Sequence, residues 1–97
     1  MSKEILRDPD EGLRIAYLSL NSSHTVHDFE DWRTKLDPGD GKIGVYKVFV
    51  LTCELAIRSN SAFNPDQERS IVYAAGYYTG MAVTALAFEL AASRIEN

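Results

Sequence analysis

The sequence predicts a mainly α-helical fold: one domain over residues 1–97, built as a small bundle of about four helices with a long C-terminal helix. Three observations lead to this prediction. Helix-capping residues recur along the chain, each followed by a proline or an acidic residue. Apolar residues follow the caps at helical spacing. Residues 71–88 carry no charge and form a run too long for a single β-strand.

The first two helices are predicted from their caps. Asp8 precedes Pro9, and Glu11 stands at the third position, where the carboxylate of a capping box belongs. Thr25 is the second cap, with an acidic residue three positions later. The proline- and glycine-rich segment 37–41 ends the second helix. The apolar residues that follow the first cap at helical spacing are Leu13, Ala16, Tyr17 and Leu20.

The segment 42–58 carries signals for both kinds of secondary structure. Its β-branched residues favour a strand, but it is longer than strands usually are. We therefore predict a mostly buried helix. The alternative is an α+β fold with a short antiparallel sheet, formed by strands at residues 13–20 and 43–51.

The net charge of −4 at pH 7 arises entirely within residues 1–40, which carry nine acidic and five basic side chains. Residues 41–97 carry five of each. The pI of about 5.0 argues against direct binding of DNA or RNA, because such binding rests on Lys and Arg neutralising phosphates. A single cysteine excludes an internal disulfide, and the N-terminal residues lack an apolar signal core. We therefore expect a cytoplasmic protein.

Residues that could perform catalysis or bind a metal are sparse. His24 and His27 lie three apart, but no further histidine or spaced cysteine completes a tetrahedral metal site. Cys53 falls in the most apolar segment, where a thiol behaves as a small hydrophobic side chain. The glycines in segment 39–44 lack the ending of a phosphate-binding loop. We predict a protein that is not an enzyme and has no metal or cofactor.

The excess of acidic side chains within residues 1–40 predicts a surface for a basic partner. Such a partner would be a basic protein or a nucleoprotein complex, and Trp32 would supply an aromatic anchor beside the carboxylates. The acidic residues of this predicted surface are Asp8, Asp10, Glu11, Asp28, Glu30, Asp31, Asp37 and Asp40.

A short, acidic, cytoplasmic chain without catalytic residues resembles the small phage-encoded anti-CRISPR proteins. The resemblance is one of general character over the whole chain and assigns no role to individual residues. It implies a non-enzymatic inhibitor, with DNA mimicry as one mechanism, that blocks the binding of target DNA by a surveillance complex.

The C-terminal helix gives the alternative function. It is predicted to begin at the cap Asn64 and to run to about Ile95. Its small residues suit close contact with another helix, either within the bundle or in a second copy of the chain. The self-assembling module predicted in this way is a dimer or small oligomer with a small-ligand site between subunits, and its predicted contact residues are Tyr73, Gly76, Tyr77 and Gly80. Polar residues within the uncharged run disfavour a membrane span.

Overall fold

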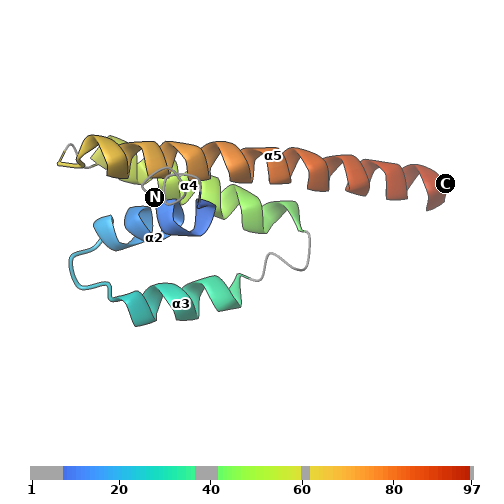
Figure 1. The fold of residues 1–97 in the computed structure, drawn as a ribbon. Helices are drawn as coiled ribbons and strands as arrows, with labels where there is room; N and C mark the ends of the chain where they lie inside the picture. Colours follow the sequence, from blue (N-terminus) through green and yellow to red (C-terminus); the bar gives the residue numbers. More distant parts are fainter. Residues whose placement is uncertain (1–7, 37–41, 60–61, 97) are drawn as a thin grey trace.

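A computed structural model of the chain describes residues 8–36, 42–59 and 62–96. It confirms the predicted helical fold (Figure 1), whose four helices are α2 (Pro9–Ser19), α3 (Val26–Lys35), α4 (Ile43–Ser59) and α5 (Pro65–Glu96). The described residues include no β-strand, and segments 13–20 and 43–51 lie in helices. The α+β alternative is therefore wrong. The predicted contact residues Asp37 and Asp40 lie outside the described residues.

The predicted caps hold the beginnings of the helices. The Asp8 carboxylate accepts a hydrogen bond from the backbone N–H of Asp10 at 3.0 Å. Thr25 and Asp28 form a reciprocal capping box, in which each side chain accepts from the backbone N–H of the other. At α5, Asn64 and Gln67 bond in the same reciprocal way, at 2.8 and 3.0 Å. These bonds satisfy backbone donors that the first turn of a helix leaves free.

The core lies where α5 packs against α2 and α4, and α2 also packs against α4. Its fully buried side chains come from all three helices. They are Leu13, Ala16, Phe49, Cys53, Ala56, Ile71 and Ala74. The shorter α3 runs antiparallel to α2 on the far side from α5 (Figure 1). Trp32 attaches α3 to the bundle. The Trp32 ring stacks on the Tyr17 ring with 4.7 Å between ring centroids and packs edge-on with the Phe49 ring at a centroid distance of 5.5 Å.

The backbones of α2 and α5 lie close together at Gly12. A Cβ atom at this position would lie 2.0 Å from the carbonyl oxygen of Ser70. No side chain fits there, so the contact requires glycine even though glycine weakens a helix interior.

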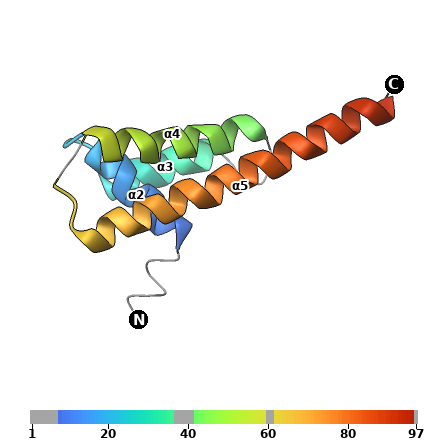
Figure 2. The same cartoon turned by 90° about the horizontal axis from the view of Figure 1, so that it is seen from above.

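The last part of α5 extends beyond the bundle. The molecule measures 50 Å along its longest axis and 26 by 25 Å across, and Figures 1 and 2 both show the end of α5 projecting past the other helices. Ala85 is the last buried residue within the part of α5 whose burial is described, and all of residues 86–94 are exposed. Residues 86–94 therefore have no covering element in the described part of the chain.

Candidate functional site

The acidic residues at the start of α2 bond to other groups of the same chain, although Asp8 and Asp10 are exposed. Asp8 caps its own helix, as described above. Asp10 accepts hydrogen bonds from Arg33 and from the hydroxyl of Tyr78, both at 2.8 Å. Glu11 pairs with Arg14 one turn later on α2. These carboxylates therefore already have positively charged or hydrogen-bonding partners within the chain.

The acidic residues of α3 are all exposed. Asp28 belongs to the capping box, and its hydrogen bonds from the backbone and hydroxyl of Thr25 lower its pKa. Asp31 pairs with Lys35 at 3.0 Å, while no ion pair involves Glu30 among the described residues. Because α2 and α3 are antiparallel, Asp28 lies at the opposite end of this helix pair from Asp10. The two predicted acidic groups do not form one cluster.

A cluster of Asp10, Arg33 and Tyr78 joins α2, α3 and α5. Burial lowers the pKa of the Arg33 guanidinium, but Asp10 and Tyr78 raise it by more, and the net shift is upward. Burial and the Asp10 carboxylate together raise the pKa of Tyr78. Arg33 thus remains a cation and Tyr78 a neutral donor at neutral pH. The cluster is a polar tie between three helices.

The three tyrosines of α5 face different ways. Tyr78 is buried and turned towards Asp10, whereas Tyr73 and Tyr77 are exposed. Tyr77 meets the ring of Tyr78 edge-on at 5.2 Å. A small depression of about 160 Å³ lies beside the polar cluster, and its lining comprises Pro9, Asp10, Arg33, Tyr46, Tyr77, Tyr78 and Met81.

The histidines and the cysteine do not gather into a chemical site. The His24 ring stacks on Tyr17 at 4.2 Å, and His27 is exposed. No group of three or more metal-ligating side chains occurs among the described residues. Burial raises the pKa of the Cys53 thiol to about 12, so it remains protonated and unreactive at neutral pH.

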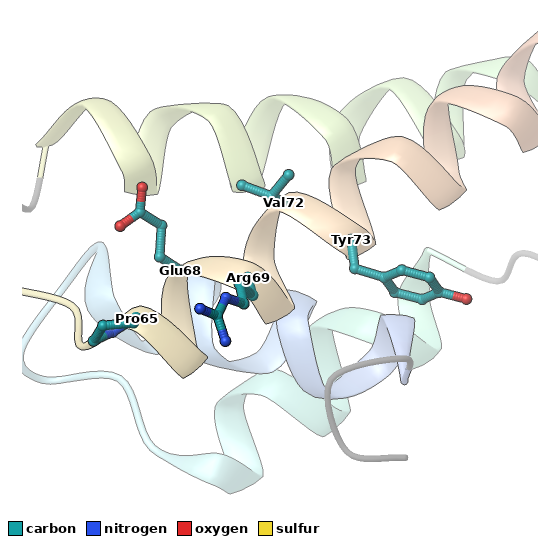
Figure 3. Close-up of a pocket in the computed structure, with 5 residues that line it drawn as sticks. All are labelled: Pro65, Glu68, Arg69, Val72 and Tyr73. Atoms are coloured by element: carbon teal, nitrogen blue, oxygen red, sulfur yellow. The ribbon is translucent and has the colours of Figure 1, made fainter. Parts of the chain in front are cut away.

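An exposed face of α5 carries a regular row of small and apolar residues. We call it the outer seam: Val72, Gly76, Thr79, Val83, Leu86 and Leu90. Successive members are separated by four and three residues in alternation, the spacing of a coiled-coil heptad. Every member is exposed, and the exposed fractions of its valines and leucines run from 43% to 63%. The row runs beside the buried face of α5, on the side of α4. Figure 3 shows Val72 on this side, and Thr79 borders a shallow depression together with Val50 and Leu51 of α4.

Two glycines on this side of α5 have no packing role within the described chain. A Cβ atom at Gly76 or Gly80 would meet no atom within 4 Å, unlike one at Gly12. Glycine in a helix interior costs about 0.8–1.0 kcal/mol relative to alanine. The fold described above therefore gives no reason for either glycine.

A larger depression of about 550 Å³ lies over the first turns of α5. Its described lining residues are Pro65, Glu68, Arg69, Val72 and Tyr73. Figure 3 shows Glu68 and Val72 on the side of α4, with Arg69 and Tyr73 on the opposite side. Arg69 forms a long ion pair with Asp66, at 3.6 Å. No ion pair involves Glu68 in the described part of the chain.

One helix among the described residues, Pro65–Arg94, is long and apolar enough to cross a membrane. This judgement rests on length and composition alone. The most apolar window of the helix has a mean hydropathy of 1.4, and 28% of the window is buried.

The chain was compared with protein-family models, with curated proteins and with solved structures, and no match was found in any of the three comparisons.

The structure separates the residues that the sequence grouped on α5. Gly76 lies on the outer seam, and Tyr73 and Gly80 flank it, but Tyr77 lies away from it, beside the polar cluster. Sequence reasoning missed Val72, Val83, Leu86 and Leu90 as candidate contact residues. Their alternating spacing of four and three residues was the signal that could have identified them.

Proposed function

We propose that this protein is a self-assembling helical module in which two copies join along the outer seam. The proposal rests on one observation: the heptad-spaced members of the seam are all exposed, although α5 already buries another face against α2 and α4. A helix packed in a bundle needs one apolar face, whereas α5 carries a second. In a coiled coil, such a row is the surface that meets another helix.

The glycines support the same proposal. Close packing of α5 from a second copy would explain glycine at positions 76 and 80, because small residues let two helices approach at short distance. The exposed Leu86 and Leu90 lie on the projecting part of α5, where no described residue of the chain covers them.

A second copy of the chain accounts for the seam better than a membrane does. The inner face of α5 is covered by α2 and α4 and carries the polar tie from Tyr78 to Asp10. Among the described residues of α5, only 86–94 form an unbroken exposed stretch beyond the bundle. This stretch extends about 14 Å, against a hydrocarbon core of about 30 Å. A membrane-spanning α5 would have to leave the bundle.

The oligomeric state tests the proposal. Analytical ultracentrifugation of the full chain should show a reversible dimer. Replacing Val83 and Leu86 by glutamate should raise the dimer dissociation constant at least 100-fold while the helical circular dichroism stays unchanged. The buried seam would then carry charges that have no partner.

Phe88 provides a matched control. It is 72% exposed, more than any large seam residue, and it lies on the same projecting part of α5 but off the seam. Phe88→Glu should leave the dimer intact. A wild-type chain that is monomeric at 100 μM or above contradicts the proposal, as does equal loss of dimer in Phe88→Glu, which would indicate non-specific association.

A second candidate function keeps the acidic surface but restricts it to α3. We infer that a basic protein or nucleoprotein partner binds the exposed residues Asp28, Glu30 and Asp31, in the manner of an anti-CRISPR-like inhibitor. The supporting observation is that all three carboxylates are exposed and that no ion pair involves Glu30 among the described residues, whereas on α2 Asp10 is paired with Arg33 and Glu11 with Arg14. Exposed charges mainly raise the association rate.

The test of this second candidate compares two charge reversals. Glu30→Lys should weaken capture of a basic partner from a host lysate at low salt, whereas Glu89→Lys, the same change on the projecting part of α5, should not. Equal capture by both variants, or capture that does not weaken with salt, contradicts an acidic contact surface.

A further inference from the structure

The outer seam is complementary to itself in one orientation. Its first half carries small residues, Gly76 and Thr79 beside Val72, and its second half carries the larger Val83, Leu86 and Leu90. We propose that two copies pair antiparallel with the register centred on Met81, so that the first half of each seam meets the second half of the other. This inference rests on the proposed function and specifies its geometry.

The antiparallel register fits the heptad positions. In an antiparallel coiled coil, the two core positions of the heptad face each other across the pair, and this register obeys that rule at every layer. It places Leu90 against Val72, Leu86 against Gly76 and Val83 against Thr79. A large side chain meets a small one, and Leu86 enters the open space over Gly76 where a Cβ atom would find no neighbour within 4 Å.

A parallel pair would pack unevenly. Each seam residue would face the same residue of the other chain. Gly76 would then lie opposite Gly76 and leave a gap, while Leu86 and Leu90 would lie opposite their equivalents and hold the helices apart. Gaps and overpacked layers both destabilise an interface. The sizes of the seam residues therefore select the antiparallel orientation.

The depression at the start of α5 supports this orientation. It lies over Glu68, Val72 and Tyr73 (Figure 3). This is where the antiparallel register brings the projecting end of the other copy. Leu90 of that copy would reach Val72, and Arg94 would lie near the Asp66 carboxylate and the ring of Tyr73, which suit a guanidinium. In a parallel pair the two depressions would face each other unfilled.

Charge alone does not choose between the orientations, because a parallel pair would place Glu89 of one copy near Arg94 of the other. The experiment must therefore report geometry directly. Two single-cysteine additions do so, Val72→Cys and Leu90→Cys, each in the full chain and one carrying a tag that separates them by size. The native Cys53 is buried and stays in both chains.

The two variants are mixed in equal amounts, allowed to exchange and oxidised mildly. The antiparallel register predicts a disulfide between Val72→Cys of one chain and Leu90→Cys of the other, exceeding the two homodimeric disulfides at least tenfold. Identical positions would lie about 27 Å apart, far beyond the roughly 7 Å that a disulfide tolerates between Cα atoms. Phe88→Cys mixed with Val72→Cys is the control and should give little product.

Each outcome has a distinct meaning. Homodimeric disulfides in a chain that ultracentrifugation shows to be dimeric overturn the antiparallel register but leave the proposed function standing. A dimer in which neither pair forms a disulfide also overturns the register. A chain that remains monomeric removes the proposed function itself, and the register with it.

Discussion

The inner and outer faces of α5 are alike in composition and opposite in environment. The inner face buries Ser70, Ile71, Ala74, Tyr78 and Ala85 against α2 and α4. The outer seam has a similar mixture of small and apolar residues, yet every one of its residues is exposed. Composition thus indicates how closely another helix can approach, but it does not indicate whether that helix belongs to the same chain.

The largest effect on stability is expected at Gly12, the residue of α2 that packs against Ser70 on the inner face of α5. Its replacement by alanine would place a Cβ atom 2.0 Å from the Ser70 carbonyl oxygen, which forces α2 and α5 apart. We expect Gly12→Ala to destabilise the fold by about 3 kcal/mol or more. Chemical denaturation followed by circular dichroism measures this loss. Gly44→Ala is the control, because nothing lies within 4 Å of a Cβ atom there, and it should stabilise by up to about 1 kcal/mol. Equal effects would contradict the close contact.

The helices were predictable because their signals are local. Caps at Asp8, Thr25 and Asn64 each act within one turn, so the sequence alone places the beginnings of three helices correctly. Residues 42–58 carried conflicting signals, and length identified the helix despite the β-branched residues. The bonds of Asp10 could not be predicted. They join residues 23 and 68 positions apart, and only the packed fold brings these together.

The candidate site was only partly predictable for the same reason. The small residues of α5 looked like one surface in the sequence, but Ala85 is buried on the inner face while Gly76 lies on the outer seam. Ala85 packs against another helix of the same chain, whereas Gly76 is proposed to pack against a helix of a second copy. The predicted acidic surface combined α2 and α3, and the interaction of Asp10 with Arg33 depends on tertiary contacts that a sequence does not display.

The second-largest effect is expected on the outer seam. Gly76→Leu should leave the fold and its thermal stability largely unchanged, because the position is open in a single copy. In the antiparallel pair it would meet Leu86 of the other chain twice per dimer. Overpacking costs about 1–3 kcal/mol per site, which raises the dissociation constant at least tenfold. Sedimentation equilibrium measures this change. Unfolding of the variant would show instead that the position is packed within the chain.

Tyr78 provides a smaller test of the inner face. Tyr78→Phe keeps the ring, including its edge-on contact with Phe49 at 4.9 Å, and removes only the hydroxyl that donates to Asp10. Loss of this bond should destabilise the fold by about 0.5–1.5 kcal/mol. Thermal denaturation should show a melting temperature lower by several degrees, while the dimer remains intact. Tyr77→Phe is the control and should change neither, because no hydrogen bond of its hydroxyl is present among the described residues. A similar loss in both variants would exclude a specific role for the bond to Asp10.

The smallest effect is expected away from both faces, at the cap of α3. Hydrogen bonds from Thr25 lower the pKa of Asp28 below its ordinary value of 3.8. A carboxylate whose pKa is lower in the folded state stabilises the fold above its ordinary pKa, and this contribution is lost as the pH falls through the folded value. Asp28→Asn retains an oxygen that can accept from the Thr25 backbone but cannot be protonated in this range. The melting temperature of the wild type should therefore fall towards that of Asp28→Asn between pH 5 and pH 2. Parallel curves for the two proteins would show that the capping carboxylate contributes no pH-dependent stability.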